Sequence, residues 1–470
     1  MWVFTLRVVN RGFGFIRTII LARLLIPEDF GILGIAMLAA STLDALSQTG
    51  IQAALVNRKG DVNEYLDVAW TTLALRGVFL FAAMFISAPF IARFFESDQS
   101  RLVIMVTAVN MLLTGFGNIG IVFFQKEMEF NKQFIYELMS AVVDLVLSIS
   151  LAFVLRNVWA LVWGGMAKNI TRFFLSYILH PYRPRLRFDR EKFNHLFGYG
   201  MWISGSTILI FLVTQGDDIF VGKILGVTAL GFYQMAYLLS NLPTTEISDV
   251  ISRVSFPAYS KLQMDPVRLR SAYVKVLQIT TYVSVPIAAG IFILGKEFTA
   301  IFLGPKWLAM VPALKILAVA GLVGSITATA KPVFLGVGKP QIDTILQVIR
   351  LLILVGVIYP LSIRWGIAGA ALAVLMSASV SAIGFTIMAV RVTAWAYKSF
   401  IKVVVVPLAN AAVMIFVIMI VGRTFDKIGL LQFLMLVGIG MLVYFCMTFI
   451  FEKLLKYGMI KIIKEIYFNI

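Results

Sequence analysis

The sequence predicts an all-α integral membrane protein of about 14 transmembrane helices, with two parallel six-helix lobes followed by two C-terminal helices. Hydrophobic residues make up 60% of the 470 residues and charged residues 14%, whereas soluble domains have roughly 45–50% and about 25%. The apolar residues form blocks of about 20 residues, the length of a membrane-spanning helix and not of a strand in an outer-membrane barrel. Similar motifs also recur in the two halves of the chain at a nearly constant offset.

Fourteen apolar segments are expected to cross the membrane, and their order gives the domain organisation. The segments are 2–25, 30–54, 68–92, 102–124, 134–155, 158–179, 197–222, 228–252, 273–295, 308–330, 342–363, 366–390, 400–422 and 429–451. The clearest break is a basic stretch after the sixth segment. We therefore predict an N-terminal six-helix lobe at 1–180, a basic cytoplasmic linker at 181–196, a second six-helix lobe at 197–392, and two additional helices with a basic tail at 398–470.

Short motifs in the first half match motifs in the second half. The matches are Arg23-Leu24-Leu25, Gly31 and Ala36 with Lys223-Ile224-Leu225, Gly231 and Ala236, and Arg156 and Ala160 with Arg364 and Ala368. They bring the six spans before the basic stretch into register with the six after it. Because six is even, the lobes are expected to be parallel repeats related by an axis along the membrane normal. That arrangement is typical of transporters and places the cargo site between the lobes, near the midplane.

The distribution of lysine and arginine predicts the orientation of the chain in the cell (inner) membrane. Loops after even-numbered spans, together with the tail, carry 23 basic residues, and loops after odd-numbered spans carry 9. The positive-inside rule then places both termini in the cytoplasm. The net charge of +17 is explained by these loops facing anionic lipid, so no nucleic-acid partner is expected.

Cysteine and histidine are too few for a metal site or a disulfide framework. The only cysteine is Cys446, and the two histidines, His180 and His195, flank the basic stretch without metal-ligand spacing. No metal or other cofactor is expected, apart from a proton or sodium ion that drives transport.

Three arginines on one face of the first span indicate an anionic cargo. At 100° per residue, Arg7, Arg11 and Arg17 share an arc of about 120° with Asn10 and Gly14. Each arginine at the bilayer centre costs roughly 2.5–3.5 kcal/mol, so the face is expected to line a wet cavity. The alternative is that Arg7 and Arg11 extend to the nearby membrane interface.

Two further arginines lie deep in predicted spans. Arg76 lies in the third span and Arg350 in the eleventh, and both are candidates to bind the cargo. The alternative for Arg76 is a buried ion pair with Asp44 or Asp144. Basic residues at 168 and 172, one turn apart in the sixth span, lie nearer the cytoplasmic end and are expected to extend to the interface.

Four intramembrane acids have two alternative roles. A carboxylate in a medium of low dielectric can carry a coupling proton, whereas a neighbouring arginine holds it ionised. Asp44 and Asp144 are candidates for ion coupling, with ion pairing as the alternative. Asp217 and Asp218, toward the end of the seventh span, are expected to form structural ion pairs.

Several motifs resemble those of prokaryotic polysaccharide flippases in the multidrug/oligosaccharidyl-lipid/polysaccharide exporter superfamily. They cover roughly residues 1–390 and are the segments 20–31, 67–70, 75–77, 215–222, 225–236 and 256–257. The resemblance implies a carrier that moves undecaprenyl-pyrophosphate-linked oligosaccharide across the membrane by alternating access, together with a polysaccharide polymerase and chain-length machinery. Such proteins usually begin with a short charged segment, whereas this chain begins almost within its first span. A start upstream of Met1 would account for this departure.

The leading prediction is a flippase for lipid-linked repeat units of exopolysaccharide, O-antigen or a similar polymer. Arginines would bind the pyrophosphate through bidentate hydrogen bonds. A multidrug exporter of the same fold is an alternative, but its mostly cationic or apolar cargo favours carboxylates and aromatic residues. A membrane-embedded polymerase or glycosyltransferase is disfavoured because the longest outer loop has only about a dozen residues, so the chain is not expected to be an enzyme.

Overall fold

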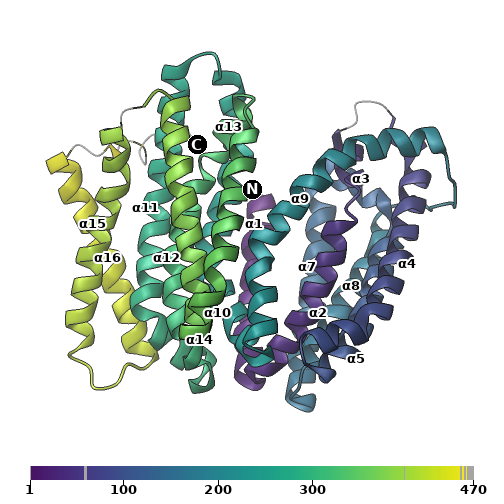
Figure 1. Ribbon diagram of the computed structural model, residues 1–470, viewed down its shortest axis with the longest axis horizontal. Coiled ribbons are helices and arrows are strands. Elements are labelled where there is room, and N and C mark those ends of the chain that lie inside the picture. The colour runs from purple at the N-terminus through teal and green to yellow at the C-terminus, as the bar shows by residue number, and fades with distance from the viewer. Residues whose placement is uncertain (1, 58–60, 396, 456–457, 460–461, 463–470) are drawn as a thin grey trace. The chain divides into compact units, whose positions relative to one another are not determined.

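The computed structural model describes residues 2–57, 61–395, 397–455, 458, 459 and 462, and every regular element in these ranges is helical (Figure 1). The predicted all-α class is therefore confirmed. The chain forms two compact units, Met1–Phe232 (unit 1) and Tyr233–Ile470 (unit 2). This boundary lies beyond the basic stretch, within a helix, and the lobes expected at 1–180 and 197–392 stay a prediction.

Unit 1 consists of helices that pack both against their neighbours in sequence and against helices distant in sequence. Its elements are α1 (Trp2–Leu24), α2 (Pro27–Leu46), α3 (Ile51–Asn57), α4 (Asn63–Phe94), α5 (Asp98–Gly115), the 3₁₀ turn η1 (Ile119–Ile121), α6 (Val122–Lys126), α7 (Phe130–Leu155), α8 (Trp159–Leu179), α9 (Arg190–Ile224) and the start of α10 (Val227–Leu262). Helix α7 packs against α1 and α8, and α4 packs against α5. These pairings place α7 between two helices that carry basic residues.

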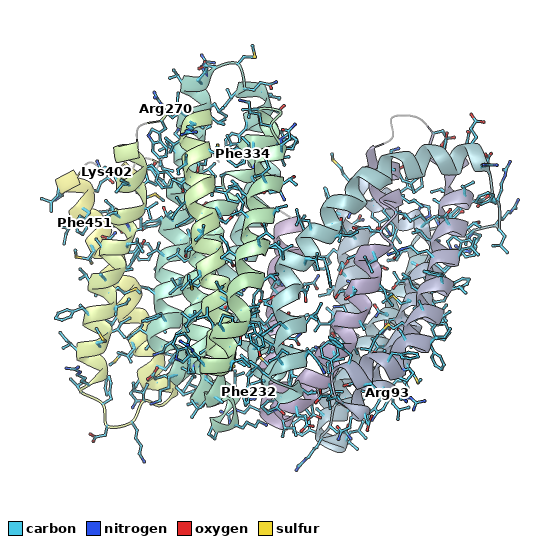
Figure 2. All side chains as sticks on the ribbon, in the orientation of Figure 1. Arg93, Phe232, Arg270, Phe334, Lys402 and Phe451 are labelled. Atoms are coloured by element: carbon cyan, nitrogen blue, oxygen red, sulfur yellow. The ribbon has the colours of Figure 1, made fainter. Side chains whose placement is uncertain are left out.

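Unit 2 continues with longer helices. After α10 come α11 (Pro266–Phe298), η2 (Thr299–Leu303), η3 (Pro305–Met310), α12 (Val311–Ala328), α13 (Lys331–Gly336), α14 (Gln341–Val392), α15 (Tyr397–Gly422) and α16 (Leu430–Leu455). Arg270 and Lys402 lie toward the same end of these helices (Figure 2). The lysine and arginine count assigns both residues to cytoplasmic loops, and their shared position is consistent with that assignment.

Eight of the described helices are long and apolar enough to cross a membrane, or nine if the bent pair Asp98–Gly115 and Ile119–Lys126 counts as one span. Helix α14 has 52 residues, which is about 78 Å of helix against a hydrocarbon core of about 30 Å. Its backbone breaks at Gly366, where φ is 56° and ψ is −136°. This break coincides with the first residue of the predicted span 366–390, and a total of fourteen spans stays a prediction.

Two glycines of the internal repeat pack against each other's helices. A Cβ on Gly31 of α2 would overlap the carbonyl oxygen of Val227, and a Cβ on Gly231 of α10 would overlap that of Pro27. The contact is reciprocal between positions exactly matched by the offset of 200 in the sequence. Small residues at such crossings let two helix backbones approach closely.

Alanine at Gly231 is therefore expected to destabilise the protein. The added methyl must push α2 and the start of α10 apart, and overpacking of this kind costs about 1–3 kcal/mol. Thermal unfolding of the detergent-purified variant should show a lower midpoint than the wild type. Gly216→Ala is the control, because a Cβ at Gly216 meets no atom within 4 Å. Equal midpoints for the two variants would contradict the packing described here.

The basic stretch after α8 is extended and is fastened to α4. The Tyr182 hydroxyl donates to Asp67, and the backbone N–H of Arg185 donates to the same carboxylate at 3.2 Å. The N–H of Arg187 donates to the Thr71 hydroxyl at 3.0 Å. Burial and the Asp67 carboxylate raise the pKa of Tyr182 well above its usual range. Helix α9 begins at Arg190, so part of the predicted linker is helical.

Candidate functional site

Four polar residues form one strip along α7, and three of them are buried. Glu137, Ser140, Asp144 and Ser148 are spaced three or four residues apart, so they lie on the same helix face. Ser140 and Ser148 are fully buried, and Asp144 is 8% exposed. On α8, a Cβ at Gly164 would overlap the Ser148 hydroxyl, so the glycine allows α8 to approach the strip closely. We call these four side chains the α7 polar strip.

Helix α1 brings Arg17 to the strip. Its Nε lies 2.9 Å from Asp144 Oδ1 and donates to Ser148 Oγ at 3.1 Å. The Ser148 hydroxyl in turn donates to Asp144 at 3.0 Å. Within the described part of the chain, the two terminal nitrogens of Arg17 make no hydrogen bond. The Asp144 carboxylate thus holds the guanidinium in place, and the terminal N–H groups of Arg17 remain available for a further anion.

Helix α8 contributes two more cations to the same strip. Arg172 forms an ion pair with Glu137, donates to Ser140 Oγ at 3.4 Å, and lies 5.9 Å from the centre of the Tyr136 ring. Lys168, one turn earlier, is partly buried and interacts electrostatically with Asp144 and Glu137. Both side chains were predicted to extend to the membrane interface. Their one-turn spacing could be read from the sequence, but their proximity to Glu137 and Asp144 of α7 could not.

Together these residues form a cationic site inside unit 1. We define it as the α7 polar strip with Arg17, Lys168 and Arg172. Three cations face two carboxylates, so one positive charge is in excess. The sequence predicts that α1 and α8 span the membrane as α7 does, and in that setting an excess charge is costly unless the cations meet water or an anionic ligand. The arrangement therefore suits a ligand with at least one negative charge, bound by N–H groups in a fixed geometry.

Arg76 and Asp44 meet elsewhere in unit 1, at the C-terminal end of α2. Arg76 Nη2 donates to Asp44 Oδ1 at 2.6 Å and to the Asp44 carbonyl at 3.1 Å, while Nε donates to the Ser47 carbonyl at 2.9 Å. The guanidinium therefore caps the end of α2: it gives the Ser47 carbonyl a donor and adds a second donor to the Asp44 carbonyl, which also accepts from the Ser47 N–H at 3.2 Å. This geometry gives Arg76 a structural task, and a role in cargo binding stays a prediction.

Alanine at Arg76 is expected to destabilise unit 1 by about 1–3 kcal/mol, because the Ser47 carbonyl loses the guanidinium donor and the Asp44 carbonyl keeps only its bonds from Ser47. Asp44→Ala should cost less, since the Asp44 side chain is 55% exposed and exposed ion pairs contribute only about 0–1 kcal/mol. Thermal midpoints of the two single variants test this order. A larger loss for the Asp44 variant would show that the ion pair, and not the cap, matters most.

The remaining candidate residues are Arg7, Arg11, Asp217, Asp218 and Arg350. Arg11 is exposed on α1, and the side chain of Arg7 is not among those described. Asp217 and Asp218 are buried in α9, at 2% and 6% exposure, and their assignment to structural ion pairs stays a prediction. Arg350 is partly buried in α14 of unit 2, where its Nε makes no hydrogen bond to the described residues.

No described group of three or more His, Cys, Asp or Glu side chains is arranged to hold a metal ion. The identity of a coupling ion, proton or sodium, stays a prediction. Asp44 and Asp144, the two candidates for coupling, each form an ion pair with an arginine.

A family model described as polysaccharide biosynthesis protein matches residues 20–312. An uncharacterized membrane protein in the cps region of Klebsiella pneumoniae is 27% identical, over 93% of this chain and 91% of that protein. The lipopolysaccharide biosynthesis protein WzxC of Escherichia coli (strain K12) is 25% identical, over 69% of this chain and 66% of its own length.

Among solved structures, the chain resembles the lipid II flippase MurJ in an inward closed conformation. The TM-score is 0.75 with 16% sequence identity, and the match covers 96% of this chain and 98% of that one. At this level of identity the likeness shows the fold alone.

Proposed function

Because this chain belongs to the family of polysaccharide biosynthesis proteins, we propose that it is a flippase for undecaprenyl-pyrophosphate-linked oligosaccharide repeat units. It is a multi-pass membrane protein and a transporter, not an enzyme. Membership of the family supports a role in polysaccharide biosynthesis, and the fold is shared with a flippase. The charges and hydrogen-bond donors of the cationic site suit a pyrophosphate.

The observation that carries the proposal is the arrangement of Arg17. Its Nε is held by Asp144 and Ser148, so the guanidinium has a fixed plane before cargo arrives. The two terminal nitrogens then offer parallel N–H donors to two phosphate oxygens, the bidentate pairing that distinguishes arginine from lysine. Lys168 adds a compact positive charge one helix away. The pre-oriented guanidinium of Arg17 and the ammonium group of Lys168 together match a doubly anionic pyrophosphate.

We propose that transport follows alternating access. The protein is proposed to lie in the inner membrane of the cell, with both termini in the cytoplasm. The pyrophosphate binds the cationic site from the cytoplasmic side, and the polyprenyl chain stays in the bilayer. The parallel repeat predicted from the sequence supports this cycle, because rocking of two related halves around a central site is a common transporter mechanism. A polymerase and chain-length machinery would then use the repeat unit on the outer side.

The second candidate function is a multidrug exporter of the same fold. Mostly cationic cargo would meet repulsion at a site where three cations face two carboxylates. We therefore favour the lipid-linked oligosaccharide, and the two functions predict opposite responses to neutralising Arg17.

Deletion of the gene in the producing strain tests the proposal. We expect lipid-linked repeat units to accumulate in the inner leaflet of the cytoplasmic membrane while surface polymer disappears, and a plasmid copy to reverse both effects. Leaflet position is measured by the access of a membrane-impermeant glycan-modifying enzyme in spheroplasts and in inverted vesicles. Normal outer-leaflet levels in the deletion strain, with greater sensitivity to cationic dyes, would instead support the multidrug exporter.

A further inference from the structure

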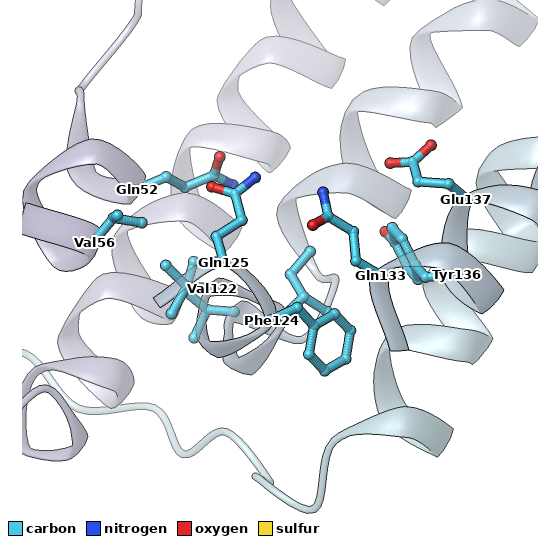
Figure 3. Close-up of a pocket in the computed structure, with 10 residues that line it drawn as sticks. Gln52, Val56, Val122, Phe124, Gln125, Gln133, Tyr136 and Glu137 are labelled. Carbon is cyan, nitrogen blue, oxygen red and sulfur yellow. The ribbon is translucent and has the colours of Figure 1, made fainter. Parts of the chain in front are cut away.

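Unit 1 contains a partly open cavity of about 430 Å³, separate from the cations of the cationic site. Three glutamines, Gln52 of α3, Gln125 of α6 and Gln133 of α7, line it together with Tyr136 and Glu137. Figure 3 shows the three carboxamides directed into the same space. We call it the glutamine pocket. Its volume lies within the range of small-molecule sites, about 300–1,000 Å³.

Local structure explains why these side chains converge. Gly50, with φ of 63°, turns the chain after α2, and α3 then buries Ile51 and Leu55 in a cluster with residues of η1 and α6. Gln52 lies beside this buried face, about 80° around the helix from its centre, and lines the cavity. The bend of 69° between α5 and the Ile119–Lys126 segment brings Gln125 to the same place.

The chemistry of the lining selects a neutral ligand that carries several hydroxyl groups. A carboxamide both donates and accepts hydrogen bonds, as a sugar hydroxyl does. Within the described part of the chain, the amides of Gln52, Gln125 and Gln133 make no hydrogen bond. Buried Phe124 and the Tyr136 ring provide apolar surface beside them.

Charged ligands fit the glutamine pocket poorly. Its described lining includes no lysine or arginine, which disfavours a phosphate. The single carboxylate, Glu137, is neutralised by its ion pair with Arg172, which disfavours a cation. A polyhydroxylated, uncharged group therefore fits best.

The pocket also lies next to the proposed pyrophosphate site. Glu137 belongs both to its wall and to the α7 polar strip, and Asp144 follows two helical turns later, about 10 Å along the axis. In a lipid-linked oligosaccharide the first sugars are attached directly to the pyrophosphate. We propose that the glutamine pocket binds the sugars next to the pyrophosphate, an inference that rests on the proposed function. The glutamine pocket lies at the end of unit 1 that is expected to face the cytoplasm, where cargo is loaded.

Two lipid probes separate the two sites. The purified protein in nanodiscs is titrated with the producing strain's undecaprenyl-pyrophosphate-linked repeat unit and with sugar-free undecaprenyl pyrophosphate. In the double variant Gln125→Leu/Gln133→Leu, which keeps volume but loses hydrogen bonding, the Kd for the repeat unit should rise about tenfold or more. The Kd for sugar-free lipid should stay unchanged. Gln99→Leu, at an exposed position of α5, is the matched control and should change neither value.

The outcomes distinguish this inference from the proposed function. An unchanged Kd for the repeat unit in the double variant, or an equal loss for both lipids at an unchanged thermal midpoint, would overturn the subsite alone. Failure of the wild type to bind either lipid would overturn the proposed function and the subsite with it. If the double variant has a lowered thermal midpoint, Gln52→Leu is tested in its place, because it changes an exposed side chain of α3. The same tenfold rise in the Kd for the repeat unit is expected.

Discussion

Replacing Arg17 by alanine is expected to abolish transport of the lipid-linked oligosaccharide. The change removes the only side chain of the cationic site that offers a preset pair of N–H donors among the described contacts. Loss of a charge-assisted bidentate contact costs several kcal/mol, so transport should fall at least about a hundredfold. Lysine at this position keeps the charge but not the fork, and should restore only part of the rate. Initial rates of lipid translocation in proteoliposomes measure the effect.

The single alanine variant also leaves Asp144 without its partner, which can cost about 3–5 kcal/mol in a buried ion pair. The double variant Arg17→Ala/Asp144→Asn removes both charges and should recover thermal stability while remaining inactive. Recovery of both stability and transport would show that Arg17 serves only as a counter-ion, and would remove the argument for an anionic cargo.

Replacing Asp144 by asparagine is expected to lower the thermal midpoint more than Asp44→Asn does. Asp144 is buried, and its carboxylate balances Arg17 at 2.9 Å, whereas the side chain of Asp44 is largely exposed. Breaking one partner of a buried pair leaves the other charge uncompensated. A second change, Arg17→Gln, should restore the midpoint.

The alternative for Asp144 is ion coupling, and the same purified variant distinguishes it. If Asp144 carries the coupling proton, Asp144→Asn should bind lipid-linked oligosaccharide normally and keep its midpoint. Its transport would then be slow and independent of the proton gradient. Measuring the midpoint and the gradient dependence on one preparation therefore separates an ion-pair role from a coupling role.

Helix positions followed closely from apolar block length, because membrane spans are defined by a length that the bilayer imposes. The segments 134–155 and 158–179 correspond to α7 and α8, and the division of α14 falls at Gly366, where the second of two predicted spans begins. The predicted span 30–54 is interrupted, since α2 ends at Leu46 and α3 begins at Ile51. Gly50, with a positive φ, permits that turn.

The partners of the charged residues could not be derived from periodicity. Helical spacing placed Arg17 on a polar face, but its partner Asp144 is distant in sequence and is met only through the packing of α1 on α7. Arg76 and Asp44 were considered as an ion pair, and the structure adds that Arg76 caps α2. Arg172 was predicted to extend to the membrane interface, because nothing in its own segment indicated that Glu137 would be its ion-pair partner. Side-chain pairing across helices depends on tertiary packing, which spacing within one helix does not encode.

The central claim is that the protein moves a pyrophosphate-linked oligosaccharide from one leaflet to the other. The most direct measurement uses proteoliposomes that contain only the purified protein and the lipid-linked repeat unit, with an impermeant glycan-modifying enzyme added outside. With wild-type protein the modified fraction should rise from the outer-leaflet share towards completion, and with Arg17→Ala/Asp144→Asn it should stop at that share. A wild-type fraction that also stops at the outer-leaflet share, under every imposed proton or sodium gradient, would contradict the claim.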